Sequence, residues 1–338
     1  MKKRLQYINL LRIYATLAIV ITHTSIMFSS SKGLQFPDGD FILYNIICRL
    51  HKFAVPIFLL ISGALLLKPE KKLTYHDMLH KYMPRIIRVL LIFGFAMCLA
   101  EAFMIRSADE TPLQVFLLSA KNLLTGHCWE HMWYMYMLLG LYALTPVYKT
   151  FIDNATKRDS VIFMVLLGIM CVVLPYLKNY HLIPSLQHYL MLPVYLFVYP
   201  CGYYINEYFK PNKYTITLAV CMLAVFFLRA VYHSYHGIEA FHGYDPYAVF
   251  AAVSIFHLSR LIRTESSSVM DKLSKHTFCI YIVHAAVLNV LFKFLHVETI
   301  VNIHPLVNYI TIAIVAFLTS WLISIVLRQI PYLRDKIL

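Results

Sequence analysis

Arg12 and His23 place a guanidinium and an imidazole inside the first long apolar run of the chain, residues 5–28. A charged side chain within a membrane span costs roughly 2.5 to 3.5 kcal/mol, so it marks a functional site by default. Eleven residues at about 100° each return to within about 20°, so the two side chains share one helix face, about 16 Å apart. Asn9 and Thr16 fall on the same stripe. This polar face suits proton transfer and anion binding.

Basic residues gather just before and within the start of the third apolar run. Arg85 and Arg88 are three residues apart and share a helix face, and Lys72 and Lys81 precede them. Guanidinium forks match phosphate oxygens, so this cluster could bind a phosphorylated ligand. The ordinary alternative is a set of cations that extend to the membrane surface and only record topology.

The fourth apolar run, residues 132–148, begins beside a group of polar and aromatic side chains. Glu130, His131, Trp133 and Tyr134 lie within five positions of one another. A belt of aromatic residues at the membrane surface would explain the tryptophan and the tyrosine. It would not explain a histidine next to a glutamate, so a place in a channel or on the acceptor side is the competing interpretation.

The second apolar run, residues 41–67, carries a cation and a helix breaker. Pro56 removes one helix hydrogen bond, which favours a kink, and Gly63 allows another helix to approach closely. A kinked packing helix with cations at its outer end is one interpretation. The functional one is that Arg49 and the kink line an opening near His23.

The ninth run contains Tyr281 and His284, a tyrosine and an imidazole on an otherwise apolar helix. A lone buried histidine is more often a hydrogen-bonded core residue than a catalyst. The seven cysteines form no Cys-x-x-Cys or metal-spaced pair, and six lie in apolar runs, so no metal site is expected. No phosphate-binding loop, zinc-protease, serine-hydrolase or dinucleotide motif occurs.

The elements that carry these residues are membrane spans. The 338 residues are 60% hydrophobic and 14% charged, with a mean hydropathy of +0.65. We expect a single all-α domain over residues 1–338, a polytopic bundle of about ten helices, whose first span is an uncleaved anchor because Arg12 interrupts a signal-peptide pattern. The expected spans are 5–28, 41–67, 86–105, 132–148, 161–177, 189–209, 214–232, 247–262, 277–295 and 305–327.

The net charge of +13 resembles that of a nucleic-acid-binding protein, but its distribution argues against nucleic acid. With the N-terminus in the cytoplasm, 21 of the 30 Lys and Arg residues fall on the cytoplasmic side, eight outside, and Arg12 within the membrane. This bias follows the positive-inside rule and predicts that both termini are cytoplasmic.

Taken together, these segments resemble the acyltransferase-3 family of integral membrane proteins. The resemblance runs through most of the chain, and five motifs occur in the expected order. They are Leu11-Arg12 with His23 eleven residues after Arg12, Val55-Pro56-Ile57-Phe58 with Ser62-Gly63, Arg85-x-x-Arg88, His131-x-Trp133-Tyr134 leading to Leu141-Tyr142 and Pro146, and Ile280-Tyr281-x-x-His284.

The resemblance implies a bundle that moves an acyl group, usually acetyl, from cytoplasmic acyl-CoA to an acceptor, with no resident cofactor. Acceptors in the family are typically hydroxyls of envelope saccharides or lipid-linked glycans, which places the protein in a bacterial cytoplasmic membrane among its lipids. By similarity, His23 is the key catalytic residue, Arg12 supports the same channel, and Arg85 and Arg88 lie on the acyl-CoA side. The chain looks like a stand-alone member without an additional extracytoplasmic domain.

Two rival functions fit the same features less well. A transporter or exporter of a glycan or small metabolite could use the polar channel without chemistry, but it would not need a basic cluster on one side only. A membrane sensor or scaffold would not need the Arg12–His23 stripe. The sequence leaves open the acceptor, the acyl length, transfer to oxygen or nitrogen, a covalent intermediate and the oligomeric state.

Overall fold

The computed structural model describes residues 6–105, 110–179, 191–238, 245–262, 268–300 and 304–338. All regular structure in these segments is helical, which confirms the all-α prediction. The α-helices are α1 (Gln6–Ser31), α2 (Gly39–Leu50), α3 (Ala54–Leu66), α4 (Tyr75–Asp77), α5 (Met83–Val89), α6 (Phe95–Ile105), α7 (Pro112–Thr125), α8 (Trp133–Asn154), α9 (Lys157–Gly168), α10 (Leu174–Asn179), α12 (Tyr195–Tyr208), α13 (Lys213–Tyr235), α14 (Pro246–Ser259), α15 (Ser268–Asn289), α16 (Val297–Ile300), α17 (Pro305–Leu327) and α18 (Pro331–Lys336). Between them lie short π-helical turns η1 (Met78–Tyr82), η2 (Leu90–Gly94), η4 (Ile169–Val173) and η5 (Val290–Phe294), and a 3₁₀ turn, η3 (Glu130–Met132).

Seven helical segments are long and apolar enough to cross a membrane, so this is an integral membrane protein. They are Gln6–Ser31, Gly39–Leu66, Tyr75–Met104, Lys157–Lys178, Lys213–Tyr235, Ser268–Phe294 and Pro305–Leu327. The other three expected spans coincide with α8, α12 and α14, although the first two residues of 189–209 lie outside the described part. Of these, α12 and α14 have 14 residues each, and α8 is longer but carries several tyrosines and a lysine.

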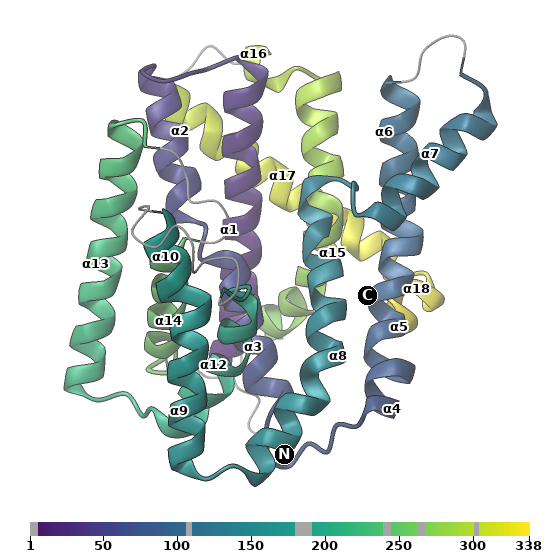
Figure 1. Ribbon diagram of the computed structural model, residues 1–338. Helices are drawn as coiled ribbons and strands as arrows, with labels where there is room; N and C mark the ends of the chain where they lie inside the picture. The colour runs from purple at the N-terminus through teal and green to yellow at the C-terminus, as the bar shows by residue number, and fades with distance from the viewer. Residues whose placement is uncertain (1–5, 106–109, 180–190, 239–244, 263–267, 301–303) are drawn as a thin grey trace.

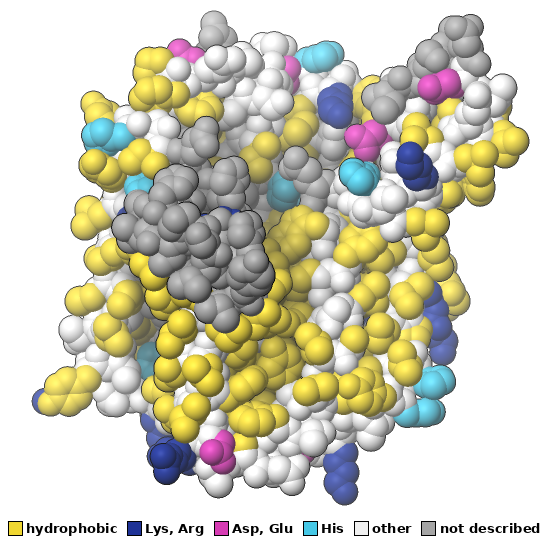
Figure 2. Space-filling model, in the orientation of Figure 1, with side chains coloured by type: hydrophobic (Ala, Val, Ile, Leu, Met, Phe, Trp, Pro, Cys, Tyr) yellow, Lys and Arg dark blue, Asp and Glu magenta, His cyan; other side chains and the backbone are white. Residues whose placement is uncertain are grey.

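The long helices stand side by side, with α1 spanning most of the height of the bundle (Figure 1). The α3–α4, α8–α9 and α12–α13 links lie at the end where α1 begins, which we call the N-terminal end. The α1–α2 link lies at the other, the opposite end. Figure 2 shows a broad band of hydrophobic side chains between the two ends, as expected for a surface that faces lipid.

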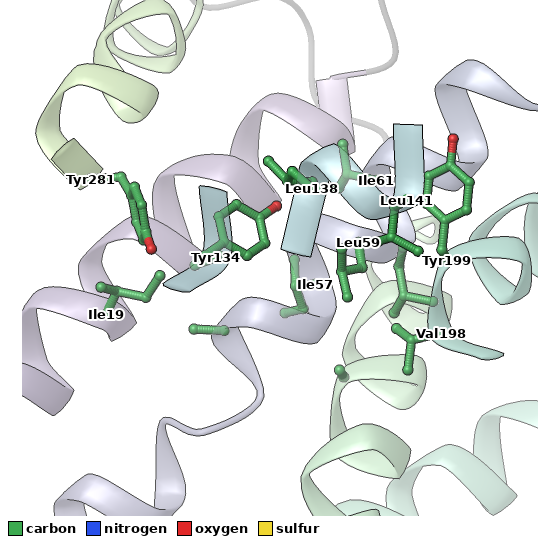
Figure 3. Packing of buried hydrophobic residues seen from close by; sticks show 14 of the residues in the cluster. Ile19, Ile57, Leu59, Ile61, Tyr134, Leu138, Leu141, Val198, Tyr199 and Tyr281 are labelled. Carbon is green, nitrogen blue, oxygen red and sulfur yellow. The ribbon is translucent and has the colours of Figure 1, made fainter. Parts of the chain in front are cut away.

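Helix α1 packs against α2, α3, α15 and α17, so its polar stripe is enclosed by other helices. The surrounding core joins side chains from five helices (Figure 3). The side chains labelled there are Ile19 of α1, Ile57, Leu59 and Ile61 of α3, Tyr134, Leu138 and Leu141 of α8, Val198 and Tyr199 of α12, and Tyr281 of α15.

Two glycines allow α3 and α12 to touch backbone to backbone. A Cβ atom on Gly63 would lie 1.7 Å from the carbonyl oxygen of Tyr199, and one on Gly202 would lie 1.9 Å from that of Leu60. Neither position can therefore hold a side chain without separating the two helices. This confirms the close helix approach that Gly63 predicts.

The second span is interrupted before Pro56, as predicted. Helix α2 ends at Leu50 and α3 begins at Ala54. Ring pairs fix the level of the break along α1: Tyr44 stacks on Phe28, with centroids 5.1 Å apart, and Phe53 stacks on Tyr14 at 5.3 Å. Helix α2 thus descends beside α1, and Arg49, between the two pairs, lies near the level of His23.

Candidate active site

Three histidines from distant parts of the chain meet near the middle of the bundle. His23 comes from α1, His131 from η3 and His284 from α15. The ring centroid of His284 lies 5.1 Å from that of His23 and 5.1 Å from that of His131, and the His23 and His131 centroids are 6.4 Å apart. All three belong to motifs seen in the sequence, but only the packing of α15 and the η3 turn near α1 brings them together.

Backbone carbonyls orient two of these rings. Nε2 of His131 donates to the carbonyl oxygen of Ile282 at 3.1 Å, and Nδ1 of His284 donates to that of Tyr281 at 2.6 Å, since a carbonyl only accepts. The Tyr281 hydroxyl donates in turn to the carbonyl of His131. The other ring nitrogens, Nδ1 of His131 and Nε2 of His284, are buried without a partner among the described atoms. Both are free to accept a proton or a substrate hydrogen bond.

His23 is half-buried, unlike its two neighbours, which are 2% and 0% exposed. Its side chain makes no hydrogen bond within the part of the chain that the structure describes. It is therefore the most exposed of the three histidines. No group of three or more His, Cys, Asp or Glu among the described residues has the geometry of a metal site. An imidazole can transfer a proton or accept an acyl group.

A cavity of about 480 Å³ opens at the N-terminal end and reaches toward the histidines. Tyr134 and Tyr281 line it, and the Tyr281 ring lies 5.8 Å from the rings of both His131 and His284. Two aromatic side chains thus separate the cavity from the histidine cluster.

This cavity is strongly basic. Five cations line it and, among the described lining residues, there is no Asp or Glu. The cations are Arg12 of α1, Lys71 of the α3–α4 link, Arg85 of α5, Lys275 of α15 and Arg328 after α17. A cavity with such a charge attracts anions.

Arg12 and Arg85 are held differently. Within the described structure, the Arg12 side chain has no hydrogen bond and no ion pair. Arg85 donates from Nε to the carbonyl of Ile337 and from Nη2 to the terminal oxygen of Leu338, both at 2.8 Å, and its guanidinium lies 5.0 Å from the centre of the Phe278 ring. Arg85 is therefore fixed in the cavity wall, and Arg12 is an uncompensated cation beside it.

The remaining cations proposed from sequence do not line the cavity. Arg88 donates to the carbonyl of Lys336 at 3.4 Å, Lys81 lies 5.7 Å from the Tyr82 ring centre, and Lys72 is exposed. Lys71, Lys275 and Arg328 line it instead. Lys71 belongs to the basic cluster expected from sequence, whereas Lys275 and Arg328 were counted only as topology signals. Which cations face inward depends on helix packing, and no local pattern records it.

A second cavity, of about 670 Å³, lies along the C-terminal part of α1 and α2. Ser30 lines it, and eighteen residues, or five helical turns, place Ser30 on the same stripe as Arg12. Arg49 also lines it and donates to Oδ1 of Asn45 and to the carbonyl of Ile238. One face of α1 therefore passes from the basic cavity, past His23, to this second cavity.

Buried polar atoms without partners face the second cavity. The hydroxyl of Tyr44 and Nδ1 of His233 have no hydrogen bond among the described atoms, and both residues line the cavity. Two cations, Arg49 and Lys52, line it as well, with no carboxylate among the described lining residues. The site offers donors and acceptors to a polar ligand, and sequence reasoning had identified only Arg49 there.

The other predicted residues divide between the core and the surface. Tyr134 is buried against Tyr281, with ring centroids 5.5 Å apart. Trp133 is 38% exposed and packs on Tyr195 of α12 at 5.4 Å, away from the histidines. The side chain of Glu130 lies outside the described residues. Trp129, which was not singled out, has its ring centroid 6.5 Å from that of His131.

Comparison with known proteins agrees with this architecture. Searches of curated proteins and of solved structures give no match. A protein-family model described as an acyltransferase domain matches residues 5–325, nearly the whole chain, which includes both cavities' α1 residues and all three histidines. The resemblance expected from the five motifs is confirmed, and the chain belongs to the acyltransferase-3 family of membrane acyltransferases.

Proposed function

We propose that the protein moves an acyl group, most simply acetyl, from acyl-CoA to a hydroxyl of a cell-envelope saccharide or a lipid-linked glycan. The observation that carries this proposal is the basic cavity, in which Arg12 has no described counter-charge and whose lining residue Tyr281 contacts the histidine cluster. An anionic donor at one end of the bundle and a base near its middle are what acyl transfer from coenzyme A requires.

Coenzyme A is a phosphorylated carrier with a long, thin pantetheine arm. Its phosphates suit the cations of the cavity, Arg12 first among them and then Lys71, Arg85 and Arg328, because charge-assisted hydrogen bonds to phosphate are the strong ones. The arm would extend past Tyr134 and Tyr281 toward His23. Acyl-CoA is the donor substrate in this proposal and not a resident cofactor.

In this proposal the N-terminal end faces the cytoplasm, and the charge distribution supports that orientation. The α3–α4, α8–α9 and α12–α13 links at this end belong to the loops that carry the Lys and Arg excess. Acyl-CoA is made in the cytoplasm, so the basic cavity opens toward its source. The second cavity then faces outward, and the protein resides in a bacterial cytoplasmic membrane with both termini inside.

The second cavity supplies the acceptor side. Tyr44 and His233 offer buried unpartnered polar atoms, and Arg49 lies near the level of His23. Serine hydroxyls and aromatic rings in the same wall suit a saccharide, which presents hydroxyls at its rim and apolar ring faces. A sugar hydroxyl that enters here approaches His23 from the side opposite to the donor.

In the transfer, a ring nitrogen of His23 removes the proton from the acceptor hydroxyl, whose oxygen attacks the thioester carbonyl. The tetrahedral intermediate collapses, the C–S bond breaks, and the proton passes to the coenzyme A sulfur. His131 and His284 hold His23 in place and can share its proton. If His23 is instead the nucleophile, coenzyme A is released before any acceptor is added, which a burst measurement distinguishes.

The test is incubation of the purified protein with labelled acetyl-CoA and a panel of envelope glycans, followed by mass spectrometry of the glycans. An added acetyl group on one glycan class, together with one equivalent of coenzyme A released, supports the proposal. Passage of unmodified glycan across proteoliposomes, without coenzyme A release, would favour the exporter instead.

A further inference from the structure

Two cysteines that the proposed chemistry does not use lie against each other at the edge of the site. Cys98 belongs to α6, and Cys128 lies in the link between α7 and η3. Their Sγ atoms are 2.7 Å apart, and Cys98 is 1% exposed. This separation exceeds a disulfide bond by only about 0.7 Å. Among the described residues, the other five cysteines have no such thiol neighbour.

We propose that Cys98 and Cys128 form a disulfide bond in the mature protein. The thiolate of one cysteine attacks the disulfide of a thiol–disulfide oxidoreductase, and the second thiolate then resolves the mixed disulfide. One S–S bond forms in this chain and one breaks in the oxidant. The two electrons reduce the oxidant's disulfide, and its two sulfurs take up the two protons that the cysteines lose.

The location of the pair favours oxidation, on the topology given under Proposed function. Helix α6 rises toward the opposite end of the bundle, where α7 also lies (Figure 1). That end faces outward in the proposed topology, and disulfides persist in extracytoplasmic compartments. This contact could not be predicted from the sequence, because 29 residues separate the two cysteines in the chain and Cys98 resembles an ordinary core residue.

The bond would anchor the segment that carries His131, three residues after Cys128. Helix α7 ends at Gly126, whose φ of +78° turns the chain back toward the bundle. Between that turn and η3, apart from Cys98, the polar contacts of the Cys128 thiol among the described residues are weak: the carbonyl of Gly94 at 3.6 Å and the hydroxyl of Tyr136 at 3.8 Å. A covalent link to α6 would hold this short segment, and with it His131, against the cluster.

The direct test is a thiol map of the full-length protein. Membranes are denatured in the presence of iodoacetamide, and the protein is digested and analysed without reductant. We expect a linked peptide pair that contains Cys98 and Cys128, 2 mass units lighter than the sum of the two thiol peptides, and alkylated Cys171 and Cys201. Alkylation of both Cys98 and Cys128 would overturn the proposal, as would linkage that forms only after diamide is added.

A second measurement asks whether the bond positions His131. We expect dithiothreitol to lower the kcat of the wild-type protein and leave its donor Kd unchanged, and to have no further effect on C98S/C128S. The matched control C171S/C201S should respond to reductant as the wild type does. Equal kcat in reduced and oxidised wild type would refute the positioning role. The thiol map is independent of catalysis, so a protein with the bond and without transfer activity would refute only the Proposed function.

Discussion

Replacement of Arg12 by glutamine should weaken donor binding without lowering the stability of the protein. Arg12 lines the basic cavity and has no hydrogen bond or ion pair within the described structure. Removal of the Arg12 charge breaks no hydrogen bond or ion pair and relieves the repulsion with Arg85. The free energy of unfolding should therefore not fall. We therefore expect an unfolding midpoint at least as high as that of the wild type, in contrast to the loss that follows removal of a paired buried charge.

The effect on the donor should be large. A hydrogen bond from a charged group is worth about 1.5 to 3 kcal/mol, which corresponds to a rise in Kd of about 10- to 150-fold. Arg88 provides the matched control, because it lies in the same segment as Arg85 but outside the cavity lining, and Arg88→Gln should change Kd less than about threefold. Titration calorimetry with acetyl-CoA measures both values.

A donor fragment identifies the contact. S-acetyl-pantetheine lacks the nucleotide and its phosphates, so Arg12→Gln should leave its affinity unchanged if the guanidinium binds phosphate. Higher salt should weaken acetyl-CoA binding to the wild type more than to the variant. The variant has one phosphate-binding cation fewer, so salt has one attraction fewer to screen. An unchanged Kd for acetyl-CoA in Arg12→Gln, or an equal loss in Arg88→Gln, would refute the assignment of the basic cavity to the donor.

Three further outcomes are expected. Gly63→Ala should lower stability by about 1–3 kcal/mol or more, since its Cβ would meet a backbone carbonyl at 1.7 Å, whereas Gly140→Ala, in open space, should be neutral in a thermal unfolding assay. Tyr281→Phe leaves the carbonyl of His131 without its donor and should reduce kcat with little change in donor Kd; an unchanged kcat would show that this contact does not position the histidine. A reporter fused in the 155–156 link should report cytoplasm, and an external signal would reverse the proposed topology.

The sequence alone predicted the features that depend on local periodicity. The stripe on α1, the break before Pro56 and the close approach at Gly63 follow from helix geometry and from the chemistry of single residues. All three have counterparts in the structure. The family was also predicted, because five motifs in order carry more information than any one of them.

The features that depend on packing could not be predicted. No local sequence pattern indicates that Lys71, Lys275 and Arg328 line one cavity. None indicates that Cys98 contacts Cys128. Both arise from how α5, α6, α15 and α17 are placed.

The outward position of the Trp133 side chain could have been predicted from the sequence. It follows His131 by two residues, or about 200° on a helix, and so points away from the face that carries the histidine. Tyr134, about 60° from His131 by the same count, stays on the inner face, where the structure places it.

The central claim is that His23 performs the transfer, and the most direct test is the turnover of His23→Ala with acetyl-CoA and the accepted glycan. We expect kcat to fall at least about 10²-fold while the Kd for acetyl-CoA stays within about twofold of the wild type. His80→Ala, which removes an exposed histidine at the N-terminal end, should keep full activity. Near-normal turnover of His23→Ala would contradict the account.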